Sequence, residues 1–271
     1  MPSSFPLIRG LGLIVPFLGS KRKLLDVILP IIPPHRTYVE AFAGGASVFF
    51  SKPEAERNIL NEKDVGLYRF YRNFSCRKLD RCKRIRNVCA FVPGAVRRVI
   101  DKASGDVCDQ IAARRFSILS EVGAGIRKKQ CKVEPIVTRR LEKKCPEYER
   151  RLRNAKITNL DYQDVIKRYD SPDTFIFADP PYPGTTPPTR RLGPGQAPPE
   201  SVCNLARLVK GKMLITYNDH PQVRRACAGL WHLKVPSTHA SKMLRRRDPY
   251  THELLIANYR FPGATKLQPF P

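Results

Sequence analysis

The tetrapeptide Asp179–Tyr182, which reads DPPY and is called the DPPY segment below, combines residue types that could bind a planar base. It follows an apolar run at 175–178, and a carboxylate at the end of a buried strand needs a hydrogen-bond donor as its partner. Pro180 and Pro181 have no N–H, so they offer only carbonyl acceptors. Tyr182 adds a flat face. Acceptors on a rim beside an aromatic wall suit a base with an exocyclic amino group, although a stiff turn without a ligand is the alternative.

Further carboxylates fall at the ends of other expected strands. Glu40 and Glu62 end or follow short apolar runs, and Asp161 follows another run within two residues. Ligands of open α/β sheets bind outside the carboxyl ends of the strands, so this series indicates a polar ligand lying across the sheet. The glycine turn at 42–47, FAGGAS, would let the backbone approach that ligand, or serve tight strand–helix packing. It lacks the spacing and the lysine of a phosphate loop, which disfavours a nucleoside triphosphate.

Strands that alternate with helices must position these groups. Expected strands lie at 38–39, 58–60, 156–160, 174–178, 212–217, 232–236 and 253–259, and expected helices at 20–32, from 48 onward, 65–74, 161–169, 199–210 and 220–230. This alternation predicts an α/β fold with a doubly wound, mostly parallel sheet.

The charge of the chain is strongly basic and uneven. Lys plus Arg number 49 and Asp plus Glu 24 among 271 residues, a net charge of +25. The segment 69–153 alone holds 24 Lys or Arg against nine Asp or Glu. Such an excess favours a polyanionic partner over a generically basic protein, and we expect nucleic acid. The segment is mostly helical in pattern and interrupts the alternation. We therefore expect a catalytic domain at 1–68 and 154–271 with an inserted recognition domain at 69–153.

Eight cysteines are present, but none forms a C-x-x-C pair, and the basic segment contains no histidine. This spacing disfavours zinc, and we expect no metal site. Buried free thiols are favoured, with disulfides left open for an intracellular protein of a hyperthermophile. There is no run of 18 apolar residues and no cleavable leader pattern, so we expect a protein of the cytoplasm, associated with DNA, and no membrane contact.

The ordered set of these segments resembles the Dam-type DNA adenine-N6 methyltransferases. The resemblance rests on PFLGSKRKLL, YVEAFAGGASVFF, ILNEKDVGLYRFY, NLDYQDVI, FIFADPPYP, MLITYND and ELLIANY, in that family's order. The basic segment occupies the place where the family inserts its target-recognition domain. The sequence departs from the family at Ala41, where proline is usual, at Ala46, where glycine is frequent, and at Glu62, where aspartate is frequent.

The resemblance implies a class I, Rossmann-like fold and transfer of a methyl group from S-adenosyl-L-methionine to N6 of adenine, with the target base flipped out of the duplex. It also implies roles for individual residues. The catalytic residues would be Asp179, Pro180, Pro181 and Tyr182; the cofactor would contact Phe17, Gly19, Lys21, Glu40, Phe42, Gly44, Gly45, Glu62, Asp161 and Asp179. In the basic segment, Arg114, Arg115, Arg127, Lys128, Lys129, Arg139 and Arg140 are candidates for DNA contacts, mostly to phosphates.

The chemistry at the DPPY segment would depend on hydrogen-bond acceptors. The amino nitrogen of adenine is conjugated with its ring and is a poor nucleophile. If the Asp179 carboxylate and the Pro180 carbonyl accept both amino hydrogens, the nitrogen becomes more pyramidal and its lone pair can face the methyl donor. Tyr182 would stack on the flipped base and recover part of the unstacking cost.

Three alternatives remain open at this point: an RNA adenine methyltransferase, a DNA cytosine-N4 methyltransferase, and a catalytically inactive DNA-binding relative. Double-stranded DNA is the expected partner of a monomer, and restriction-modification would add a cognate endonuclease.

Overall fold

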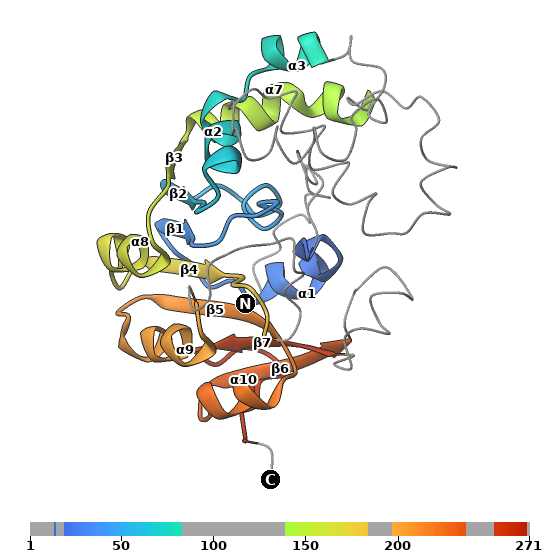
Figure 1. Cartoon of the computed structure of the whole chain (residues 1–271). Coiled ribbons are helices and arrows are strands. Elements are labelled where there is room, and N and C mark those ends of the chain that lie inside the picture. Colours follow the sequence, from blue (N-terminus) through green and yellow to red (C-terminus); the bar gives the residue numbers. More distant parts are fainter. Residues whose placement is uncertain (1–13, 15–18, 83–138, 184–196, 237–251, 270–271) are drawn as a thin grey trace, which may run out of the picture. The chain divides into compact units, whose positions relative to one another are not determined.

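The computed structural model describes residues 14, 19–82, 139–183, 197–236 and 252–269 (Figure 1). These residues fall into two compact units. The first contains residues 1–25, 44–54 and 62–159, and the second contains residues 26–43, 55–61 and 160–271, within the limits of the described ranges.

A mixed sheet forms the second unit (Figure 1). Its strands are β1 (Thr37–Glu40), β2 (Arg57–Asn61), β4 (Thr174–Ala178), β5 (Lys212–Asn218), β6 (Trp231–Pro236), β7 (His252–Ala257) and β8 (Thr265–Lys266), in the spatial order β2-β1-β4-β5-β7-β6-β8. The pairs β2–β1, β1–β4 and β4–β5 are parallel, whereas β7 runs antiparallel to both β5 and β6. Most strands therefore point the same way, which confirms the expected mostly parallel sheet and agrees with a methyltransferase-like fold.

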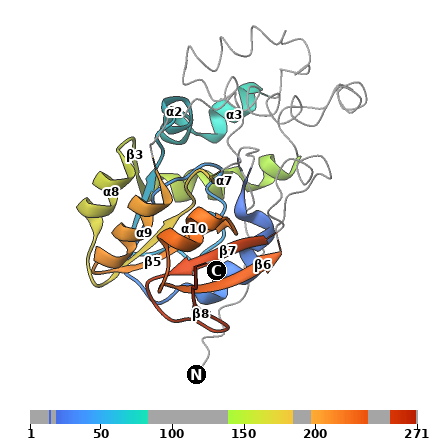
Figure 2. The same ribbon diagram turned by 60° about the horizontal axis from the view of Figure 1, so that its bottom comes forward.

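One face of this sheet carries helices α8 (Tyr162–Tyr169), α9 (Pro199–Leu208) and α10 (Pro221–Ala226), which follow one another across it in Figure 2. Alternate strand residues supply the apolar contacts, because side chains along a strand alternate between faces. The core on this face contains Val39, Ile59, Ile176, Ala178, Met213, Ile215, Leu254 and Ile256 from the strands, with Val165, Ile166, Val202, Ala206 and Val223 from the helices.

The opposite face of the same sheet is aromatic at its centre and polar at its carboxyl edge. Phe175 lies between the rings of Tyr38, at 6.0 Å, and Tyr259, at 6.5 Å. The Tyr259 hydroxyl donates to the carbonyl of Ile31, the last residue of the short 3₁₀ helix η2 (Leu29–Ile31). Burial raises the pKa of Tyr259 well above its usual value. Toward the strand ends, apolar residues on this face give way to Glu40, Thr216, Asn218 and Glu253, all of which are buried.

The first unit is mainly helical in its described part. It contains η1 (Lys21–Leu24), α2 (Val65–Asn73), α3 (Cys76–Cys82), α7 (Arg139–Arg153) and β3 (Ala155–Thr158), and the short helix α1 (Leu25–Ile28) follows η1 directly. Ser20 caps η1, and Asp64 caps α2 by accepting a bond from the N–H of Leu67 at 2.7 Å. The inserted domain as a whole stays a prediction, because residues 83–138 lie outside the described ranges.

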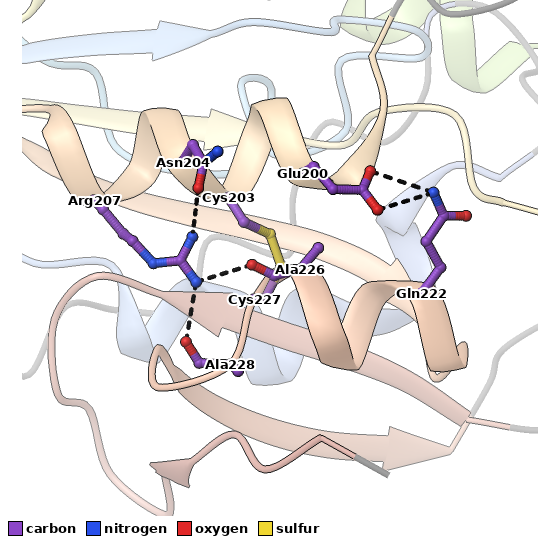
Figure 3. The surroundings of a disulfide bond; sticks show 8 residues. All are labelled: Glu200, Cys203, Asn204, Arg207, Gln222, Ala226, Cys227 and Ala228. Atoms are coloured by element: carbon purple, nitrogen blue, oxygen red, sulfur yellow. Dashed lines mark hydrogen bonds between the residues drawn. A yellow bond between two sulfur atoms is a disulfide. The ribbon is translucent and has the colours of Figure 1, made fainter.

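The structure corrects the expected state of four cysteines. Cys76 forms a disulfide with Cys145, joining α3 to α7, and Cys203 forms one with Cys227, joining α9 to the end of α10 (Figure 3). The two cysteines of each bridge are 69 and 24 residues apart in the sequence, respectively, so no short spacing between cysteines predicts either bridge. In Figure 3 the α9–α10 bridge is accompanied by Arg207, which donates to the carbonyls of residues 226 and 228.

A second difference concerns residues 48–50, which we expected to begin a helix. They lie in consecutive turns rather than in a regular helix. The N–H of Phe50 donates a hydrogen bond to the carbonyl of Ala46, and the N–H of Lys52 donates one to the carbonyl of Val48, so each bond closes a single turn. Gly44 and Ala46 have positive φ angles of 49° and 50°, and this left-handed backbone interrupts a regular helix start.

Candidate functional site

The carboxylate of Asp179 follows β4 directly and lies on the polar face of the sheet edge. Its Oδ1 atom accepts a hydrogen bond of 2.6 Å from the hydroxyl of Thr216 on β5. Asp179 is half-buried, whereas Thr216 is fully buried. The two side chains meet because β4 and β5 are parallel neighbours that end at the same edge. The structure thus fixes one oxygen of the predicted catalytic carboxylate from a neighbouring strand.

Tyr182 is anchored through its hydroxyl, which donates to Oε2 of Glu253 on β7 at 2.9 Å. The phenol is half-exposed, and its ring lies 5.9 Å from that of Tyr217. Burial, together with the charges of Asp179 and Glu253, raises the pKa of Tyr182 well above its usual value. Tyr182 therefore remains a protonated donor throughout the physiological pH range, and its ring is held at the edge of the sheet.

The prolines of the DPPY segment differ in exposure. Pro180 is buried and Pro181 is half-buried. The carbonyl of Pro183, directly after the segment, accepts a hydrogen bond of 3.1 Å from Nδ2 of Asn218. Asn218 pairs with Glu253 across the β5–β7 ladder, so the residues that bind Tyr182 and Pro183 stand side by side.

Two other predicted cofactor residues, Glu40 and Phe42, lie at the end of β1 in the same unit. Glu40 is 2% exposed and accepts a bond of 2.6 Å from the Tyr38 hydroxyl. Phe42 is half-buried and stacks on Tyr162, the first residue of α8, with ring centroids 5.2 Å apart. Asp161 caps the same helix by accepting from the N–H of Gln163. The stacked rings and the Asp161 carboxylate are therefore neighbours.

Asn61, which the sequence did not single out, holds the chain at this edge. Its amide nitrogen donates to the carbonyls of Ala41 and Leu160, and its oxygen accepts from the N–H of Leu160. Asn61 is 1% exposed. Its side chain therefore supplies hydrogen-bond partners, in a buried position, for backbone groups of the residues directly before Phe42 and Asp161.

In the first unit, Glu62 and the glycine turn are bonded to one another. Oε2 of Glu62 accepts from the N–H of Gly44 at 2.8 Å, and Oε1 accepts from the N–H of Asp64 at 2.9 Å. The carbonyl of Gly44 accepts from the hydroxyl of Tyr71 on α2 at 2.6 Å. Gly45 is buried next to it. Both peptide groups that flank Gly44 are thus fixed by side chains.

The remaining predicted cofactor residues of this unit, Gly19 and Lys21, also bond to each other. Lys21 is 5% exposed, and its Nζ donates to the carbonyl of Gly19 at 2.7 Å. Gly19 has a φ of +81°, a conformation that favours glycine, and nothing lies within 4 Å of the place where a side chain would begin. The turn is therefore open to a ligand on that side within the described residues.

Several predicted residues cannot be placed. Phe17, Arg114, Arg115, Arg127, Lys128 and Lys129 lie outside the described residues, and Arg139 and Arg140 belong to α7 without described side chains. Farther along α7, buried Arg151 donates to the carbonyls of Phe49 and Lys52, in the turns that follow the glycine segment.

Sequence reasoning missed Thr216, Asn218 and Glu253. A signal was present, because each is a polar residue on the buried face of an otherwise apolar strand. Such residues require partners, and all three find one in the DPPY segment or directly after it.

The α/β sheet, with an Asp-Pro-Pro-Tyr sequence at its carboxyl edge, is consistent with a methyltransferase-like fold. The family model of D12 class N6 adenine-specific DNA methyltransferases matches residues 17–89 and 121–195, which is more than half of the chain. The chain belongs to this family and is a methyltransferase. The matched ranges include the glycine turn, Glu62, Asp161 and the DPPY segment. A comparison with curated proteins found no match. No helix in the described ranges is both long and apolar enough to cross a membrane.

Proposed function

We propose that the protein transfers a methyl group from S-adenosyl-L-methionine to N6 of adenine in double-stranded DNA. The observation that carries this proposal is the fixed carboxylate of Asp179 beside Pro180 and Tyr182, at the carboxyl edge of β4, in a chain of the N6-adenine family. Carboxylate and carbonyl acceptors match the two hydrogens of an amino group, and a half-exposed phenol matches the face of a base.

The described residues fit S-adenosyl-L-methionine by the chemistry of their donors and acceptors. Glu62 accepts from the backbone N–H groups of Gly44 and Asp64, and its carboxylate is the type of acceptor that suits the vicinal hydroxyls of a ribose. Phe42 offers an apolar face next to the Asp161 carboxylate, which suits an adenine ring with its amino group. Glu40 suits an ammonium group, with Phe17, Gly19, Lys21, Gly44 and Gly45 as further proposed contacts. When bound, this cofactor supplies an electrophilic methyl group on a sulfonium.

The protein's own part in the reaction is to hold acceptors. Asp179 and the carbonyl of Pro180 accept the hydrogens of the target amino group and stabilise the positive charge that develops on its nitrogen. Asp179 is then placed to take the proton that the methylated nitrogen releases. The target base has to leave the duplex to reach these groups, and Tyr182 offers its stacking face in exchange. The basic segment 69–153, with Arg114, Arg115, Arg127, Lys128, Lys129, Arg139 and Arg140, would contact the DNA backbone.

Incubation of the purified protein with unmethylated plasmid DNA and S-adenosyl-L-methionine, followed by mass analysis of the digested nucleosides, tests the proposal. We expect N6-methyladenine. N4-methylcytosine would change the target base, and methylation of RNA in a parallel incubation but not of DNA would change the polymer. No product, with cofactor binding also undetectable by calorimetry, would indicate the inactive relative.

A further inference from the structure

Three side chains outside the DPPY segment hold it in place from strands β5 and β7. Thr216 donates to Asp179, Glu253 accepts from Tyr182, and Asn218 donates to the carbonyl of Pro183. We propose that Thr216 and Glu253 are positioning residues for methyl transfer, which orient the Asp179 carboxylate and the Tyr182 ring toward the target base. This inference rests on the proposed function.

The burial of these groups supports a dedicated role. Thr216 is 0% exposed and Glu253 is 3% exposed, and a buried hydroxyl or carboxylate is costly unless it is hydrogen-bonded. An apolar residue at either position would avoid that cost, as Leu214 and Leu255 do on the same face of the same two strands. Both polar groups instead bond to the DPPY segment. The cost is thus offset by contacts with the residues that would touch the target base.

Both contacts start from strands in the interior of the sheet. Thr216 belongs to β5 and Glu253 to the neighbouring strand β7, and each of these strands lies between two others. Thr216 pairs with Leu255 in the β5–β7 register, so it lies close to Glu253, two residues away on the same face of β7. The groups that hold Asp179 and Tyr182 are therefore rigid reference points.

Rotation of the Asp179 carboxylate is what Thr216 would prevent. An aspartate side chain turns readily about its terminal torsion, and a bond to Oδ1 selects one orientation. The acceptor must face an amino hydrogen for the nitrogen lone pair to point at the methyl donor, so a turned carboxylate lowers the rate of methyl transfer more than it lowers the affinity for the cofactor. A misplacement of about 1 Å at reacting groups can cost on the order of 100-fold in rate.

Steady-state kinetics on plasmid DNA can test Thr216. Thr216→Val keeps the shape and removes the hydroxyl, and we expect kcat to fall roughly 100-fold while KM for S-adenosyl-L-methionine changes less than about threefold. Thr216→Ser keeps the hydroxyl and should restore most of kcat. The matched control is Thr174→Val at the start of β4, where an equally buried hydroxyl donates to the Tyr169 carbonyl. This control should retain kcat.

Glu253 is tested by a double-mutant cycle with Tyr182. Glu253→Gln keeps an acceptor and should lower kcat less than Tyr182→Phe, which removes the hydroxyl. The double variant should be no slower than Tyr182→Phe alone, because both changes act on one bond. Circular dichroism of each variant establishes that it is folded.

The results separate the two ideas. An active wild type whose kcat survives Thr216→Val, or falls equally in Thr174→Val, overturns the positioning role and leaves the proposed function in place. Additive effects of Glu253→Gln and Tyr182→Phe overturn the role of Glu253. If the wild type methylates neither DNA nor RNA, the proposed function fails and this inference fails with it.

Discussion

Oε2 of Glu62 accepts a hydrogen bond of 2.8 Å from the backbone N–H of Gly44, so the acidic residue after β2 holds the glycine turn in its conformation. The second oxygen of the same carboxylate accepts from Asp64 at the start of α2. A residue expected only to contact the cofactor thus also holds the backbone in place, and its substitution should affect both cofactor affinity and stability.

Glu62→Ala should weaken S-adenosyl-L-methionine binding at least about tenfold and lower the free energy of unfolding by about 1–2 kcal/mol, because two N–H groups lose their acceptor. The affinity and stability of Glu62→Gln should lie between those of the wild type and Glu62→Ala, since an amide has a single acceptor oxygen. Isothermal calorimetry and urea unfolding provide the two measurements. An alanine variant with unchanged affinity would remove Glu62 from the cofactor site.

Asp179→Ala should abolish methylation, with a loss of at least about 1,000-fold, and leave DNA affinity within about threefold. Asp179→Asn keeps an oxygen that can accept from Thr216 but loses the negative charge, and it should be similarly slow. Nucleoside mass analysis measures the product, and fluorescence anisotropy measures DNA binding. Wild-type turnover in either variant contradicts the assignment.

Neutralising Arg127, Lys128 and Lys129 should lower DNA affinity and make its salt dependence less steep, by roughly one unit of slope for each phosphate that these cations no longer neutralise. A control variant that neutralises exposed cations of the second unit, Arg36 and Lys210, should keep the original slope. Binding titrations at four salt concentrations measure both quantities. An unchanged slope in the first variant would place the DNA elsewhere.

Reduction of the Cys203–Cys227 bridge should lower the free energy of unfolding by about 3 kcal/mol, as expected for a closed loop of 24 residues. The Cys203→Ser, Cys227→Ser variant should lose a similar amount and be insensitive to reductant at this site. Urea unfolding with and without dithiothreitol, together with peptide mapping of alkylated cysteines, checks this. Recovery of both cysteines fully alkylated from non-reduced protein would disprove the bridge.

Gly211→Ala should destabilise the protein by at least about 2 kcal/mol, because a β-carbon there would lie 2.5 Å from the Thr174 carbonyl and 2.8 Å from that of Ser171. Lys212→Ala, at the exposed first position of β5, is the neighbouring control and should change stability by less than about 0.5 kcal/mol. Equal stabilities of the two variants would show that the backbone can yield at this point.

Local pattern was sufficient to predict most of the sheet. The apolar runs around Ile176 and Ile215 gave strands within one residue of the observed ones, and Asp161 was found at the start of its helix. The antiparallel position of β7 between β5 and β6 could not be predicted in this way, because strand order depends on contacts between distant segments.

The site was predictable to the same extent. The DPPY segment is contiguous, so its residues could be recognised together. Thr216 and Glu253 are 37 and 71 residues away from their partners, and only the sheet brings them to that edge. The disulfides could not be predicted from the sequence for the same reason, since the two cysteines of each bridge come from separate helices.

The position of β7 has a consequence for synthesis on the ribosome. Tyr182 depends on an acceptor that is translated 71 residues later. A nascent chain that has emerged as far as β5 already has the hydroxyl for Asp179 but not the carboxylate for Tyr182. Full methyl-transfer activity should therefore arise only after β7 has left the exit tunnel and inserted beside β5.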